Sequence, residues 1–241
     1  MLHIISLGLF ENKDISIKGF ETAKNCHLLF IERYTNFFGS NLKELEEFLG
    51  KEIKELKRED VENKSNELIE KAKKFDVGIL IPGDCFSATT HISLLIEAKK
   101  ENVQVNIIHG SSVLTAVGEI GLILYNFGKI TTIPFDNKNI KSPIDVLKNN
   151  LNLGMHTLFL LDIKENKYMN IKEGLLYLLN NNIDENILCV GCSALGSDKK
   201  DIKSGKIKDL IKFNFKYYPQ CFILPGKMHF TEEEALELFM I

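Results

Sequence analysis

Short apolar runs alternate with longer segments of helical periodicity over the first 108 residues. The apolar runs are rich in Ile, Leu and Val, and the segments between them repeat their apolar residues three or four positions apart. We expect strands at 2–7, 27–31, 53–56, 77–81 and 103–108, and helices at 17–25, 42–49, 61–74 and 88–100. Because strand–helix–strand alternation at this spacing forms crossover units, the pattern predicts an α/β fold with a mostly parallel sheet.

The spacing changes near His109-Gly110-Ser111-Ser112, and a second set of elements follows. We therefore predict two α/β domains, 1–110 and 111–241, with parallel or mixed sheets. Thr231, three residues before Glu234, fits a capping box, and the Lys-rich stretch 199–203 is typical of a solvated loop. The later strands are expected at 130–133, 156–161, 187–190 and 220–224, and the helices at 113–124, 143–151, 171–179 and 231–239.

Composition narrows the class of protein. The chain has 241 residues, 44% hydrophobic and 26% charged, with a net charge of −3. This balance argues against a surface built to bind nucleic acid directly. No apolar run reaches the ~18 residues of a membrane span. The segment Met1–Ile5 has no basic region and enters a strand at once, so we expect no signal peptide, no membrane contact and a cytoplasmic protein.

The five cysteines are odd in number and scattered, which makes a disulfide scaffold unexpected. Cys189 and Cys192 have CxxC spacing, but no second pair accompanies them. Because they sit in an apolar run, we favour buried strand residues over redox or metal chemistry, and we expect no metal site.

The segment after the strand at 77–81 concentrates polar chemistry. Pro82-Gly83-Asp84 is followed by Ser87 and by Ala88-Thr89-Thr90-His91, so one carboxylate, three hydroxyls and one imidazole lie in a strand-to-helix turn. Ligands of open α/β sheets bind at the carboxyl ends of strands. Ser and Thr also cap helices for purely structural reasons, so the residues alone leave both interpretations open.

Gly83-Asp84 followed by Ala88-Thr89-Thr90-His91 resembles the motif of the diphthine synthases, a branch of the tetrapyrrole-methylase-like S-adenosylmethionine-dependent methyltransferases. Further segments agree in order over nearly the whole chain. They are Leu7-Gly8-Leu9, Asp14-Ile15, Lys18-Gly19, Arg58-Glu59-Asp60-Val61, Ser112, Ala116-Val117-Gly118, Phe127-Gly128-Lys129, His156-Thr157-Leu158, Leu161-Asp162-Ile163-Lys164 and Pro225-Gly226-Lys227.

The resemblance implies a fold of two α/β domains with S-adenosylmethionine in a cleft between them and S-adenosylhomocysteine as the product. The end of the first strand, Ser6-Leu7-Gly8-Leu9-Phe10, is not G-x-G-x-x-G, which argues against a Rossmann site. Asp84 suits a sulfonium or ammonium group. The cofactor contacts implied by the family are Leu9, Asp84, Ser87, Ser112, Val113, Leu161, Leu195 and Gln220.

The chain departs from the family pattern at several positions. Cys85 follows Gly83-Asp84 where the family often has Pro, Ser87 stands where an apolar side chain is expected, and Ser6 stands where Gly is more usual. On the C-terminal side, the segment 192–196 lacks the Arg of the corresponding loop, and Gln220 stands where His is expected.

The resemblance also implies the reaction. The family successively methylates the amino group of a 3-amino-3-carboxypropyl-modified histidine on translation elongation factor 2, which gives diphthine in diphthamide biosynthesis, and its superfamily forms homodimers. The proton acceptor stays open, with His91, His109 and His229 as candidates. Tyr34 with Glu32 is a further candidate for facing the methyl acceptor, since an aromatic ring or a carboxylate suits a growing quaternary ammonium.

Three other functions remain as alternatives. A cobalamin-precursor (precorrin) carbon methyltransferase shares the fold, as does a ribosomal-RNA ribose methyltransferase, although the acidic charge balance disfavours the latter. A non-catalytic binding module that keeps the fold is the third.

Overall fold

A computed structural model describes residues 1–34, 37–164 and 167–241, except for the side chain of Glu62. The chain divides into two compact units, Met1–Leu114 (unit 1) and Thr115–Ile241 (unit 2). The expected boundary was near residue 110, and the division falls a few residues later, inside a short helix, α6 (Val113–Ala116). Each unit is described by itself.

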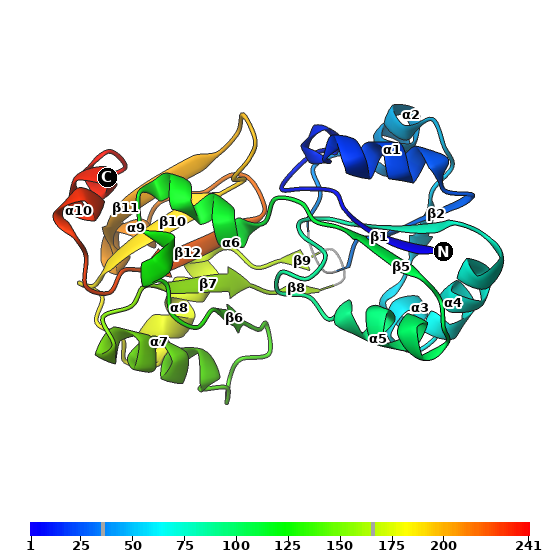
Figure 1. The fold of residues 1–241 in the computed structure, drawn as a ribbon. Coiled ribbons are helices and arrows are strands. Elements are labelled where there is room, and N and C mark those ends of the chain that lie inside the picture. Colours follow the sequence, from blue (N-terminus) through cyan, green and yellow to red (C-terminus); the bar gives the residue numbers. More distant parts are fainter. Residues whose placement is uncertain (35–36, 165–166) are drawn as a thin grey trace. The chain divides into compact units, whose positions relative to one another are not determined.

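Unit 1 is built on a five-stranded sheet in the order β3-β2-β4-β1-β5 (Figure 1). All of its pairings are parallel, as the strand–helix alternation predicts. The strands are β1 (Leu2–Ser6), β2 (Leu28–Glu32), β3 (Lys54–Leu56), β4 (Val77–Ile81) and β5 (Val105–Ile108).

Helices cover both faces of this sheet. In Figure 1, α1 and α2 lie on one side and α3, α4 and α5 on the other. Alternate strand residues supply the two cores: Ile4 and Ile79 pack toward α4 and α5, whereas Ile5 and Leu80 pack toward α1 and α2. Successive side chains of a strand point to opposite faces, so β1 and β4 need apolar residues at nearly every position. The helices are α1 (Ile17–Asn25), α2 (Leu42–Leu49), α3 (Arg58–Glu62), α4 (Ser65–Lys74) and α5 (Ile92–Lys100).

Two of the expected helices are shorter than their periodicity suggests. The pattern over 61–74 predicted one helix, but α3 ends at Glu62 and α4 begins at Ser65, because Lys64 leaves helical geometry at φ −118° and ψ 21°. The pattern over 88–100 began too early. Ala88 has a left-handed φ of 58°, and the helix starts only at Ile92.

The order of the strands creates a topological switch point between β1 and β4. The two strands are neighbours, yet β1 leads into α1 on one face and β4 leads into α5 on the other. Loops that leave adjacent strands in opposite directions open a crevice at the carboxyl edge of the sheet, which is the usual ligand position in such folds. The turn at Pro82-Gly83-Asp84 is one of these two loops.

Unit 2 contains a mixed five-stranded sheet in the order β11-β10-β12-β7-β6. Four strands are antiparallel neighbours, and β6 pairs in parallel with β7. A separate two-stranded hairpin joins β8 to β9. The strands are β6 (Thr131–Ile133), β7 (Thr157–Leu161), β8 (Ile163–Lys164), β9 (Lys167–Tyr168), β10 (Leu188–Ser193), β11 (Asp201–Lys206) and β12 (Gln220–Leu224).

The core of unit 2 lies between this sheet and three helices. Phe159 and Phe222 stack at its centre, with ring centroids 4.8 Å apart, and residues of α7, α8 and α9 pack around them. The helices of this unit are α6, which spans the boundary, α7 (Ser142–Asn152), α8 (Ile171–Asn180), α9 (Ile207–Leu210) and α10 (Phe230–Glu237).

Several expectations for unit 2 are wrong in detail. The helix expected over 113–124 stops at Ala116, continues as a 3₁₀ turn and ends at Gly121, where φ is 92°. The Lys-rich stretch expected as a loop enters β11 at Asp201, an edge strand. Edge strands tolerate charged side chains because one side faces water, so composition alone did not reveal this strand.

No helix among the described residues is both long and apolar enough to cross a membrane.

The capping box of α10 differs from the expected Thr231–Glu234 pair. His229 is the N-cap and Glu232 is the third helical residue. Glu232 is fully buried. Its carboxylate accepts hydrogen bonds from the His229 N–H (2.7 Å), the Ile123 N–H (2.7 Å) and Nε2 of His156 (3.0 Å). This one carboxylate therefore joins α10 to the segment after Gly121 and to the start of β7.

We predict that Glu232→Gln lowers the free energy of unfolding by about 1.5–3 kcal/mol at pH 7, because an amide nitrogen would face the His229 N–H. Burial opposes the charge of Glu232, but the hydrogen bonds from His229, Ile123 and His156 hold its pKa below the ordinary 4.5. Its contribution is therefore complete above that pH and is lost as pH falls through the lowered pKa. Urea unfolding of both proteins between pH 7 and 3 measures the difference.

The matched control is Glu233→Gln, an exposed neighbour on the same helix, which should change the unfolding free energy by less than about 0.5 kcal/mol. Equal effects of the two variants, or a difference that grows as the pH falls, would contradict the prediction.

Candidate functional site

The loops after β1 and β4 are joined backbone to backbone. Gly8 and Gly83 form an isolated bridge in which the Gly83 N–H donates to the Gly8 carbonyl at 2.7 Å, and the Gly8 N–H donates back at 3.2 Å. Both glycines have left-handed φ angles, 86° and 79°. A Cβ at residue 8 would lie 2.5 Å from the Cβ of Asp14. Glycine is favoured at both positions by the left-handed backbone, and at position 8 a side chain would also overlap Asp14.

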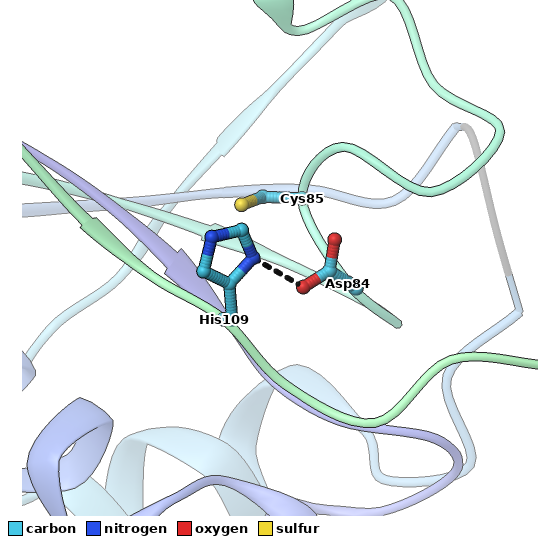
Figure 2. Close-up of side chains that lie close together, drawn as sticks. All are labelled: Asp84, Cys85 and His109. Carbon is cyan, nitrogen blue, oxygen red and sulfur yellow. Dashed lines mark hydrogen bonds and ion pairs between the residues drawn. The ribbon is translucent and has the colours of Figure 1, made fainter. Parts of the chain in front are cut away.

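The Asp84 carboxylate organises the turn that follows β4. One oxygen accepts hydrogen bonds from the Phe86 N–H (3.0 Å) and the Ser87 hydroxyl (3.2 Å). The other accepts from Nδ1 of His109 (2.9 Å) and the Gly110 N–H (3.1 Å). Figure 2 shows the Asp84–His109 contact. Since His109 and Gly110 follow β5, a single buried side chain ties the ends of β4 and β5 together.

The hydrogen bonds keep Asp84 ionised. Burial by itself would raise the pKa of this carboxyl group, but donation from the Phe86 N–H, from His109 and from the Gly110 N–H lowers it below the ordinary value. The candidate site therefore holds a fixed negative charge at neutral pH.

Ser6 and Cys85, two of the positions expected to depart from the family pattern, contact one another. The Cys85 N–H donates to the Ser6 hydroxyl oxygen at 2.9 Å, and both residues are fully buried. A proline at position 85 would have no N–H to satisfy, so a glycine at position 6 would leave nothing unpaired. The Ser6 hydroxyl thus supplies the acceptor that the buried Cys85 N–H needs.

Asp84, Cys85 and His109 offer an oxygen, a sulfur and a nitrogen within 4.8 Å of one another (Figure 2). This donor set suits zinc. A metal would have to replace the His109–Asp84 hydrogen bond and remove a proton from a thiol whose pKa burial raises. The hydrogen-bonded arrangement accounts for two of the three groups without a metal, and the expectation of no metal site stays a prediction.

A second polar cluster lies next to the turn. His91, the N-cap of α5, and Glu32, at the end of β2, are both fully buried, with Nε2 and Oε1 3.6 Å apart. Burial lowers the pKa of His91 to about 4, so the ring is neutral at pH 7. Glu32 accepts a hydrogen bond from the Tyr34 N–H at 3.2 Å. His91 has no exposed surface to offer a substrate.

Comparisons with known proteins give the family. A sequence model of the Tetrapyrrole (Corrin/Porphyrin) Methylases matches residues 1–211. The diphthine synthase of Methanocaldococcus jannaschii is 42% identical over 251 residues, covering 98% of both chains. That of Methanococcus vannielii is 42% identical over 249 residues with the same coverage of both chains. The chain belongs to the diphthine synthase family.

A solved structure titled as a diphthine synthase superimposes on the chain with a TM-score of 0.95. The two are 35% identical, and the match covers 99% of this chain and 95% of that one. The α/β class and the tetrapyrrole-methylase-like fold that the motifs indicated are therefore confirmed.

Five of the residues predicted from the diphthine synthase resemblance belong to unit 1 and follow three neighbouring strands. Leu9 is half-buried beyond β1, Asp84 and Ser87 lie beyond β4, and Ser112 and Val113 lie beyond β5. The sheet order β4-β1-β5 brings these strand ends to the same edge. The Ser112 hydroxyl also accepts a hydrogen bond from the Leu114 N–H at 3.2 Å. Their role as cofactor contacts stays a prediction.

The other three predicted contacts belong to unit 2. Leu161 ends β7 and packs into the core, and Leu195 is buried just after β10. Gln220 starts β12, and its side-chain amide is fully engaged. It accepts from the Ile171 N–H at 2.9 Å and donates to two backbone carbonyls, at 3.1 Å and 2.9 Å. These residues stay predictions for the diphthine synthase cofactor site.

Sequence reasoning singled out Asp84 and His109 separately but did not pair them. Twenty-five positions separate the two along the chain. The signal lay in their positions, because each follows a buried strand, and the strands flank β1 in the sheet. The Gly110 N–H was missed for the same reason. The hydroxyls of Ser87, Thr89 and Thr90 do not cap α5, whose N-cap is His91.

We predict that Ser6→Ala lowers the free energy of unfolding by about 1–3 kcal/mol, because the buried Cys85 N–H loses its acceptor. In a Cys85→Pro background the same replacement should have a much smaller effect, with a coupling of about 1 kcal/mol. Denaturant unfolding of the four proteins of this cycle measures the coupling.

Cys85→Ala is the control background, since it removes the thiol and keeps the N–H. Ser6→Ala should retain its full effect there. The same loss of stability in all three backgrounds would show that the hydroxyl acts on something other than this N–H.

Proposed function

We propose that the protein transfers methyl groups from S-adenosylmethionine to the amino group of the 3-amino-3-carboxypropyl-modified histidine of translation elongation factor 2, giving diphthine. The observation that carries the proposal is the polar turn at the topological switch point of unit 1, which has the family motif Gly83-Asp84 and Ala88-Thr89-Thr90-His91. The diphthine synthase relatives match the chain from end to end. We also propose a cytoplasmic location and a homodimer, as in the superfamily.

The cofactor is proposed to contact Leu9, Asp84, Ser87, Ser112 and Val113 of unit 1 and Leu161, Leu195 and Gln220 of unit 2. The support is strongest in unit 1, where the first five follow neighbouring strands and Asp84 provides a fixed negative charge. A cationic sulfonium and an ammonium group both gain from such a charge.

The chemistry required of the protein is modest. The sulfonium already activates the methyl group, so the reaction is an in-line displacement by a neutral amine. The enzyme aligns the two centres, excludes water and leaves the amine unprotonated. A free α-amino group has a pKa of about 8, so a small decrease in that pKa is enough to make the neutral form abundant at pH 7.

We predict that the purified protein transfers labelled methyl groups from S-adenosylmethionine to elongation factor 2 that carries the modified histidine. Unmodified elongation factor 2 is the control and should remain unlabelled, because it lacks the acceptor amine. Transfer to a corrinoid precursor with none to elongation factor 2 would favour the precorrin alternative. Failure to bind S-adenosylmethionine in calorimetry would favour a non-catalytic module.

We predict that Asp84→Ala weakens S-adenosylmethionine binding at least tenfold, because the turn loses its charge and the acceptor of four hydrogen bonds. Isothermal titration calorimetry measures the dissociation constant, and circular dichroism checks the fold. Asp76→Ala is the matched control, since Asp76 precedes β4 at the opposite edge of the same sheet. Equal affinities of the wild type and Asp84→Ala would remove Asp84 from the cofactor site.

A further inference from the structure

We propose that His109, held by Asp84, is the base that takes the proton from the acceptor amine. This inference rests on the function proposed above and assigns the proton acceptor of that reaction. It follows from the hydrogen bonding of Asp84, the ring nitrogen that this bonding leaves available, and the position of His109 at the carboxyl edge of the sheet.

The Asp84 carboxylate has little capacity left for a further hydrogen bond, although its charge still acts on a cation placed beside it. An ionised carboxylate accepts about four hydrogen bonds, and Asp84 already receives four from Phe86, Ser87, His109 and Gly110. Three of these donors are the backbone N–H groups of Phe86 and Gly110 and the Ser87 hydroxyl. The remaining one, the His109 ring, is 70% exposed at its side chain, whereas that of Asp84 is 10% exposed. A substrate that approaches this carboxylate therefore meets His109.

The contact with Asp84 also fixes which nitrogen of His109 is basic. Because Asp84 is ionised, it can only accept, so Nδ1 of His109 carries the hydrogen and donates it at 2.9 Å. In the neutral ring Nε2 then has a free lone pair, and in Figure 2 this nitrogen lies on the side of the ring away from Asp84. A carboxylate that orients imidazole and stabilises the imidazolium is the arrangement found in the Ser-His-Asp triad, where histidine acts as the general base.

The neighbours of His109 do not compete for the proton. Within the described part of the chain, the titratable groups clustered with it are Asp84, which holds the ring, and Cys85, whose pKa burial raises so that the thiol stays neutral. The remaining ring contact is Phe86, with centroids 6.2 Å apart. His109 precedes the predicted cofactor contacts Ser112 and Val113 by three and four residues.

The other two candidate histidines are less suited to the role. His91 is fully buried and adjoins Glu32, so its ring has no exposed surface to meet an amine. His229 belongs to unit 2, where it caps α10 and its Nδ1 lies 2.9 Å from the Thr231 hydroxyl. His109 alone among the three combines exposure with a carboxylate that fixes its tautomer.

Each methyl transfer moves one proton and one electron pair. The acceptor ammonium gives one proton to Nε2 of His109, and the freed nitrogen lone pair attacks the methyl carbon. The carbon–sulfur bond breaks with its electron pair on sulfur, which gives S-adenosylhomocysteine. The exposed imidazolium returns the proton to solvent before the next cycle. Every methyl added therefore releases one proton, and the cycle can repeat while the nitrogen still carries a hydrogen.

The test compares His109→Asn and His109→Gln with the wild type on modified elongation factor 2. Asparagine retains an N–H that can donate to Asp84 in place of Nδ1 but has no basic nitrogen. We expect kcat to fall about 100-fold or more in both variants, with the calorimetric dissociation constant for S-adenosylmethionine within about threefold of wild type. Raising the pH from 7 to 9 should restore part of the activity, because the acceptor amine then loses its proton to solvent. Adding imidazole should do the same, because it supplies an external base.

His27→Gln is the matched control. His27 is an exposed histidine with an aspartate beside it, Asp76, at the opposite edge of the same sheet, and its replacement should leave kcat within about twofold of wild type.

The outcomes separate the two proposals. Full activity of His109→Asn would reduce His109 to a structural donor, and a cofactor dissociation constant that rises in step with the loss of activity would make it a cofactor contact. Either result overturns the proposed base while the methyltransferase function stands. A wild-type protein that binds S-adenosylmethionine but labels no elongation factor 2 would overturn the function itself, and the role of His109 with it.

Discussion

The buried carboxylate of Asp84 is the interaction on which the candidate site depends. An isolated buried charge is unstable, and this one persists because four donors surround it, two from the turn after β4 and two from the turn after β5. In satisfying the charge, the chain brings two loops together and orients the exposed ring of His109. The negative charge and the position of that ring are thus consequences of the same set of hydrogen bonds.

The sheet order explains why these loops can meet. β4 lies between β2 and β1, and β5 lies on the other side of β1, so the carboxyl ends of β4, β1 and β5 are neighbours. The bridge between Gly8 and Gly83 then joins the loops that leave β1 and β4. The Ser6–Cys85 hydrogen bond satisfies a buried backbone N–H of this turn.

Different interactions stabilise the two units. Unit 1 buries both faces of a parallel sheet in apolar side chains, and polar groups gather at its carboxyl edge. Unit 2 relies on an aromatic stack in a mixed sheet and on buried polar junctions, of which Glu232 is the clearest. The Gln220 amide is a further junction, and a ligand that needed it would have to break contacts already made.

The sequence by itself determined the class of fold. Apolar strands that alternate with amphipathic helices bury their apolar residues when the strands form a parallel sheet and the helices cover it. The sequence also identified the turn at residues 82–91 and, through its motifs, the family. Tertiary structure alone decided the order of the strands, since pairing between distant segments leaves no local period. For the same reason the pairs Asp84–His109 and Ser6–Cys85 emerged only there. The N-cap of α5 is His91 and not one of the preceding hydroxyl residues, because Ala88 adopts a left-handed conformation and the helix begins later. The pattern of side chains does not predict that conformation.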